Sequence, residues 1–173
     1  ELLSKLWMGF YHRLRALLVR PETAGPDPEP QLFVRGTGAP DDPFEIHSQE
    51  EFARIADFPA SHFVLRRALL LHTPVPTIPE FTGRIDGQGH EVEGLRASSF
   101  WIGVNHGEIT DLTIMGSEIA SHNDELLTAL IGVNRGSLTR VQLSEASHHS
   151  SHRSTDSLVA GLAAANLGMI EDC

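Results

Sequence analysis

The sequence predicts an all-β fold built as a solenoid of stacked repeats, and two observations carry this prediction. Its 173 residues include 15 glycines and 10 prolines but only 6% aromatic residues, which favours many turns over long packed helices. The motif Ile-Gly-Val-Asn-x-Gly occurs at residues 102–107 and again at 131–136, and Asn-x-Gly returns at 166–168. Repeats with short β-type segments are typical of solenoids, in which each unit buries its apolar edge only against its neighbours.

The first twenty residues, ELLSKLWMGFYHRLRALLVR, have the pattern of a basic amphipathic helix. Their apolar side chains recur at alternating steps of four and three, which places them in one stripe on a helix. We expect this helix to pack on its own domain, to dock on a protein partner, or to lie on a membrane surface. The predicted docking residues are Leu3, Trp7, Phe10, Leu14 and Leu17.

A Pro-rich linker is predicted at residues 21–34, where "PETAGPDPEP" has four prolines and almost no apolar residues. Such a run cannot continue a helix and favours extended backbone. The linker therefore separates residues 1–20 from a third segment, residues 35–173, which we expect to form the β domain. No stretch of 18 uncharged apolar residues is present, so the sequence predicts no conventional transmembrane helix.

The β domain is expected to begin with a strand near residues 44–46 and a short helix at 48–58. Ser48 followed by Glu51 has capping-box spacing, which is typical of a helix start. "HFVLRRALLL" at 62–71 then has the composition of a strand. The pattern predicts a β structure with a capping helix at its N-terminal end. The helix positions predicted to face inward are Phe52 and Ile55.

The repeats can be aligned on their apolar positions. The template is Ile109, Leu112 and Ile114. A shift of 29 reaches Leu138, Val141 and Leu143, a further shift of 32 from there reaches Ile170 and Cys173, and an upstream shift of 17 from the template reaches Val92 and Leu95. The alignment predicts that Cys173 shares an inward column with Leu112 and Val141 and is a buried thiol. Because the last unit stops in mid-repeat, we expect further units or a partner to cover this end.

The repeated turn residues are Asn105 and Gly107, Asn134 and Gly136, and Asn166 and Gly168. We expect the three asparagines to stack at one corner with side chains hydrogen-bonded along the stack. We also expect these turns to use left-handed backbone conformations, which Asn and Gly tolerate at the least cost.

At these residues the chain resembles the GLUG-motif repeats of bacterial proteins. "FTGRIDGQGHEVEGL" is similar to a rung of such domains, and "IGVNHGEITDL", "IGVNRGSLTRV" and "AAANLGMIEDC" resemble successive copies of the motif. The resemblance spans about residues 35–173. It implies a right-handed parallel β-helix of the kind found in surface proteins and beside IgA-type metallopeptidases, and it specifies fold far better than activity.

Two clusters of polar side chains are candidates for chemistry. His148, His149 and His152 could bind a divalent metal if their Ser-rich loop brought them together, but nothing in the sequence organises them, so no metal site is predicted. Asp86, Asp111 and Asp172 fall on related repeat positions, with Arg140 at the equivalent place in the middle repeat. That order indicates an exposed charge ladder rather than an acid–base pair.

The predicted function is that of a non-catalytic structural or interaction module, which docks into a larger assembly through its N-terminal helix and solenoid faces. The sequence shows no complete catalytic set, so we expect no enzyme activity and no cofactor. The net charge of −10 makes nucleic acid an unfavourable partner. The alternatives are a carbohydrate-binding or carbohydrate-processing β-helix and a peripheral membrane scaffold. A cell-surface, extracellular or membrane-associated location is favoured.

Overall fold

The computed structural model describes residues 33–121, 127–150, 158–159 and 161–173. These residues belong to one compact unit, Leu32–Cys173. The predicted helix at 1–20 and most of the predicted linker at 21–34 lie outside the described residues.

Short β-strands make up most of the described chain. The helical elements are α2 (Gln49–Ala53) and the 3₁₀ turn η1 (Arg54–Asp57). The strands are β1 (Phe44–Ile46), β2 (His62–Leu65), β3 (Leu69–Leu70), β4 (Ile78–Phe81), β5 (Arg84–Asp86), β6 (Glu91–Glu93), β7 (Arg96–Ser98), β8 (Ile102–Asn105), β9 (Glu108–Met115), β10 (Glu118–Ser121), β11 (Leu127–Thr128), β12 (Ile131–Asn134), β13 (Ser137–Ser144), β14 (Ser147–Ser150), β15 (Leu158–Val159), β16 (Ala163–Asn166) and β17 (Met169–Glu171). This confirms the predicted all-β class.

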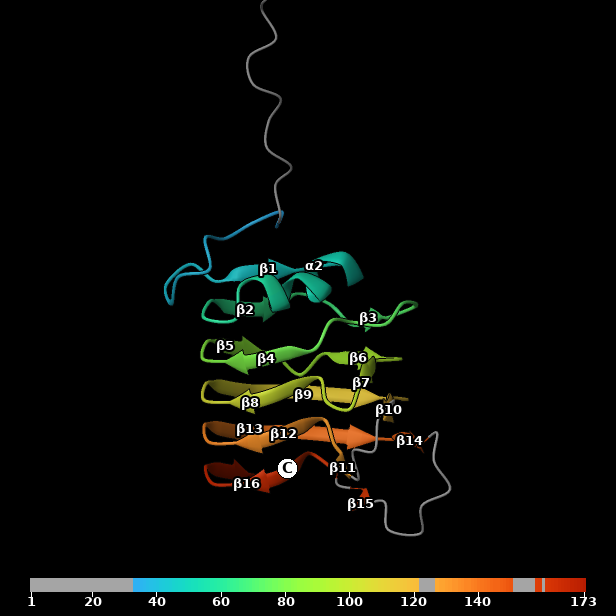
Figure 1. Cartoon of the computed structure of the whole chain (residues 1–173). Coiled ribbons are helices and arrows are strands. Elements are labelled where there is room, and N and C mark those ends of the chain that lie inside the picture. Colours follow the sequence, from blue (N-terminus) through green and yellow to red (C-terminus); the bar gives the residue numbers. More distant parts are fainter. Residues whose placement is uncertain (1–32, 122–126, 151–157, 160) are drawn as a thin grey trace, which may run out of the picture. The chain divides into compact units, whose positions relative to one another are not determined.

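Every pairing between these strands is parallel and joins one repeat to the next. The longest sheet has the order β1-β2-β5-β9-β13-β17, with β3 and β6 paired beside it, and the other sheets have the orders β4-β8-β12-β16, β7-β10-β14 and β11-β15. Parallel neighbours need long crossover connections. The crossover from β1 to β2 passes through α2 and η1, and the later crossovers pass through strands of the other sheets. The paired strands consequently follow one another in sequence order along each sheet (Figure 1).

The register confirms two of the predicted shifts and corrects the third. Asn105 pairs with Asn134, a shift of 29, and Asn134 pairs with Asn166, a shift of 32. The shift of 17 is wrong, because Ile85 rather than Val92 pairs with Ile109. Val92 instead pairs with Ile114. The turn between β5 and β6 contains two more residues than the part of β9 that lies opposite it. Val92 and Leu95 have the same three-residue spacing as Ile109 and Leu112, but they are not the equivalent residues.

The helix begins as the sequence predicts. The Ser48 hydroxyl accepts a hydrogen bond from the Glu51 backbone N–H, and the Glu51 carboxylate accepts one from Ser48 N–H, which completes the capping box. The same carboxylate, which is buried, accepts hydrogen bonds from the backbone N–H groups of Val34 and His47. Glu51 thus fixes the chain on both sides of β1.

The predicted strand at 62–71 is divided in the structure into β2 and β3. Leu65 and Leu69 are buried, whereas the three residues between them, 66–68, are exposed. Because one continuous strand would alternate its side chains between two faces, this pattern requires a bend. The N–H of Arg66 donates to Ile46 O at the end of β1, which extends the pairing up to that bend.

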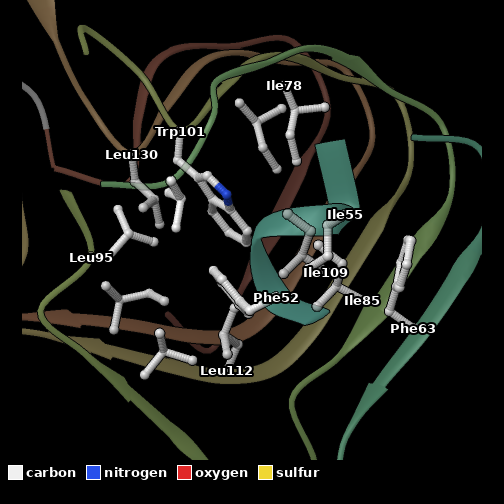
Figure 2. Close-up of a cluster of buried hydrophobic side chains, with 14 of the residues drawn as sticks. Phe52, Ile55, Phe63, Ile78, Ile85, Leu95, Trp101, Ile109, Leu112 and Leu130 are labelled. Atoms are coloured by element: carbon white, nitrogen blue, oxygen red, sulfur yellow. The ribbon is translucent and has the colours of Figure 1, made fainter. Parts of the chain in front are cut away.

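The core lies between the sheets and is formed by buried apolar side chains of α2, η1, the strands β1 to β9, β12 and β13, and the connections between them. Figure 2 shows Phe52 of α2 beside Trp101 and Leu112, with Ile85, Ile109 and Leu130 around them. The rings of Phe52 and Trp101 stack with centroids 5.3 Å apart, and both residues are buried. Phe52 and Ile55 therefore face inward as predicted. Among the described residues, no helix has the length and apolar character needed to cross a membrane.

Candidate functional site

The three repeated asparagines form a ladder along one corner of the stacked strands. Asn105 Nδ2 donates to Asn134 Oδ1 at 2.9 Å, and Asn134 Nδ2 donates to Asn166 Oδ1 at 2.8 Å. Asn105 and Asn134 are completely buried, whereas Asn166 is exposed on the last strand pair. The predicted stacking and side-chain hydrogen bonding are confirmed. These amides have partners within the stack, so their arrangement suits structure rather than chemistry.

The glycines of the motif are required by a close approach of backbone, and the expectation of left-handed turns is wrong. Neither the three asparagines nor Gly107, Gly136 and Gly168 have a positive φ. A Cβ atom on Gly107 would lie 2.1 Å from Gly83 O, and one on Gly136 would lie 2.0 Å from Gly107 O. Each asparagine also closes its own turn, as when Asn105 Oδ1 accepts a hydrogen bond from Gly107 N–H at 3.1 Å.

Left-handed backbone occurs instead at Asp111, Arg140 and Asp172, with φ of 51°, 52° and 54°. This explains why buried residues such as Ile109 and Leu112 are three apart along one strand. Regular alternation would place them on opposite faces, and one left-handed residue between them returns Leu112 to the core. The cost of a positive φ at residues other than glycine is smallest for Asp and Asn, which fits two of the three positions.

Asp111 and Arg140 form a bidentate ion pair on the outer surface. Arg140 Nε donates to Asp111 Oδ1 at 2.5 Å, and an Arg140 Nη donates to Asp111 Oδ2 at 2.7 Å. This hydrogen bonding lowers the pKa of Asp111 and raises the pKa of Arg140. A carboxylate held in this way is a poor proton donor, so the pair supports the predicted charge ladder. Asp86 departs from the ladder because it pairs with Thr110.

A hollow of about 300 Å³ lies on the outward side of β2 and β5, next to Pro40 and Pro43. Phe63 and Ile85 point into the core from these strands. By alternation, their neighbours point outward in cross-strand pairs: His62 with Arg84, and Val64 with Asp86. Sequence reasoning missed this site. The available signal was the alternation in "HFVLR" and "RIDGQ", which places polar side chains on the face away from the core.

The remaining predicted site residues have no described side-chain geometry. His148 and His149 lie on β14, where their backbones pair with Ile119 and Ala120 of β10. His152 and the predicted docking residues Leu3, Trp7, Phe10, Leu14 and Leu17 are outside the described residues. Within the part of the chain that the structure describes, no group of three or more His, Cys, Asp or Glu side chains could hold a metal ion.

Cys173 lies beside Val141, as the repeat alignment predicts, but it is not buried as predicted. The Val141 N–H donates to Cys173 Sγ at 3.3 Å, which places the thiol beside the residue with which it was aligned. The cysteine is nevertheless exposed, because no strand of the described chain lies beyond β17. Ile170, aligned with the buried Leu138, is likewise 38% exposed.

Comparison of the chain with family models, with curated proteins and with solved structures gives no match.

Proposed function

We propose that this protein is a non-catalytic structural or interaction module, built as a right-handed parallel β-helix of the GLUG-repeat type and docked in a larger assembly. The observation that carries the proposal is the asparagine ladder. The polar side chains that the sequence repeats from unit to unit bond to one another, with Asn134 linking Asn105 to Asn166. Repetition here maintains a scaffold, whereas a catalytic set would bring unlike groups to one place.

The sheet orders support the β-helix proposal. Each sheet takes one strand from each successive unit, as in β4-β8-β12-β16, and this is how a solenoid stacks its coils. The handedness rests on the general rule that crossovers between parallel strands are right-handed in about 98% of cases. We further propose that α2 caps the N-terminal end of the core, an assignment supported by the burial of Phe52 and Ile55.

Docking through the N-terminal helix rests on the apolar stripe in residues 1–20, which is too large to remain solvated on an isolated helix. The experiment compares the full chain with a stripe variant carrying Trp7→Ser, Phe10→Ser and Leu14→Ser. A matched control carries Ser4→Ala, His12→Ser and Ala16→Ser, which are the same number of changes in the same segment at positions outside the predicted docking residues. Cross-linking followed by mass spectrometry identifies protein partners, and flotation with neutral and anionic vesicles measures membrane binding.

We expect the stripe variant to lose its partner while its melting temperature stays within a few degrees of that of the parent chain. Loss of vesicle flotation instead of protein cross-links would favour the membrane scaffold. If both variants associate like the parent, docking through the helix is wrong. If the melting temperature of the stripe variant is well below that of the parent chain, the helix packs on its own β domain.

A further inference from the structure

We propose that the hollow over β2 and β5 is a binding site for a small organic carboxylate, held by the Arg84 guanidinium with the His62 imidazole beside it. The two residues pair across the strands, and their side chains leave the sheet on the same outward face. This proposal concerns a ligand site and goes beyond the structural role proposed above.

Arg84 is the cation at this hollow with the weakest attachments. Its nearest carboxylate oxygens belong to Glu108 at 3.7 Å and Asp86 at 4.0 Å, which are ion-pair separations too long for hydrogen bonds. Arg66, by contrast, donates a 2.8 Å hydrogen bond to Glu45. The planar guanidinium fork of Arg84 is thus available to a ligand, and its geometry matches a carboxylate in a bidentate arrangement.

The carboxylate of Asp86 is hydrogen-bonded to Gln88 rather than to Arg84. Its two carboxylate oxygens accept hydrogen bonds from Gln88, one from the backbone N–H at 2.9 Å and one from Nε2 at 3.0 Å. It therefore lines the hollow without engaging Arg84 closely. The negative charges of Asp86 and Glu108 near the guanidinium favour a singly charged carboxylate over a dianionic phosphate, because repulsion grows with ligand charge.

The walls of the hollow are fixed before a ligand arrives. Pro40 and Pro43 belong to a tight loop in which Asp42 N–H donates to Ala39 O and Asp42 O accepts from Gly38 N–H. Gly38 O in turn accepts from the His62 backbone N–H at 2.9 Å, which ties the loop to β2. The volume, about 300 Å³, is at the small end of ligand sites and suits a body of a few carbon atoms or one sugar ring.

The test is a titration of the ¹⁵N-labelled full chain followed by two-dimensional NMR. The probes are butyrate and glucuronate, which distinguish an aliphatic from a sugar carboxylate, with butyramide, glucose and inorganic phosphate as comparisons. We expect at least one acid to give saturable shifts around the hollow, with a Kd on the order of 1 mM. The neutral probes should give none, and phosphate should bind more weakly than the better acid.

Arg84→Gln should weaken binding at least about tenfold, and Arg84→Lys, which keeps the charge but not the fork, should weaken it several-fold. Arg140→Gln is the matched control, since Arg140 does not line the hollow and its guanidinium is bonded to Asp111. The proposal is overturned if neither acid saturates, if neutral probes or phosphate bind as well, or if Arg140→Gln has the same effect as Arg84→Gln. If Arg84→Gln does not fold, unchanged affinity in Arg84→Lys overturns it.

Discussion

The side-chain amide of Asn105 donates a 2.9 Å hydrogen bond to the side-chain oxygen of Asn134, and neither residue is accessible to solvent. The side-chain amide of Asn134 in turn donates to the side-chain oxygen of Asn166, and it also donates to Met169 O at 3.2 Å. A buried amide with its partners in place stabilises little on balance. Removing it leaves those partners without hydrogen bonds in a site that water does not reach.

Replacing Asn134 with Ala should therefore lower the free energy of unfolding by about 1–3 kcal/mol, the usual cost of an unsatisfied buried polar group. Asn166→Ala is the matched control, because Asn166 is exposed and water can replace its bonds. Urea unfolding followed by circular dichroism measures both. Equal losses in the two variants would show that burial of the ladder does not determine its contribution.

Gly136→Ala should lower the free energy of unfolding by about 3 kcal/mol, the upper range for overpacking. The added Cβ would lie 2.0 Å from Gly107 O, and backbone on both sides of this contact is held by strand pairing. Gly161→Ala provides the comparison, since a Cβ there meets nothing within 4 Å. A tolerated Gly136→Ala would mean that the turns of neighbouring repeats can move apart without loss of strand pairing.

How far the sequence predicts this fold can be judged from the motif itself. Asn-x-Gly is a reliable marker of register in the units that carry it, because the amides bond to one another and the glycines accept close backbone contacts. The preceding unit lacks the asparagine, and Phe81 pairs with Asn105 there. The motif does not show where the left-handed backbone lies: within the repeated strands it is found at Asp111 and Arg140, with Asp172 just after the last strand, and these residues look like ordinary surface charges in the sequence. The positive φ at these positions is imposed by the spacing of the buried residues on either side. The type of an exposed residue therefore does not reveal it.

The first repeat and the hollow were missed for a related reason. Apolar spacing places residues on a face but does not count the residues in an intervening turn, so the sequence pattern aligns Val92 with Ile109 although the structure pairs it with Ile114. The hollow brings together a loop near Pro43, β2 and β5, which are far apart in the sequence. Only the register between strands shows that His62 and Arg84 are neighbours.

The Asp111–Arg140 pair should make stability depend on pH in the acid range. The hydrogen bonds from Arg140 lower the pKa of Asp111 in the folded protein below its unfolded value. Its stabilising effect is therefore present above the unfolded pKa, about 3.9 for an aspartate, and is lost as the pH falls through the folded pKa. The melting temperature of Asp111→Asn should fall less between pH 6 and pH 3 than that of the parent. Identical pH profiles at low salt would contradict this.

Cys173 should react with a maleimide in the folded protein at a rate close to that of the same thiol in 6 M guanidinium chloride. It is exposed at the end of the last strand pair, and its sulfur makes only weak contacts, such as the 3.3 Å hydrogen bond from Val141 N–H. Since it is the chain's single cysteine, the measurement needs no other substitution. Leu138→Cys in a Cys173→Ser background supplies the buried reference in the same sheet, as Leu138 is fully buried. Slow labelling of Cys173, approaching that of the Leu138→Cys thiol, would mean that the end of the stack is covered in solution, by a second copy if the protection grows with protein concentration.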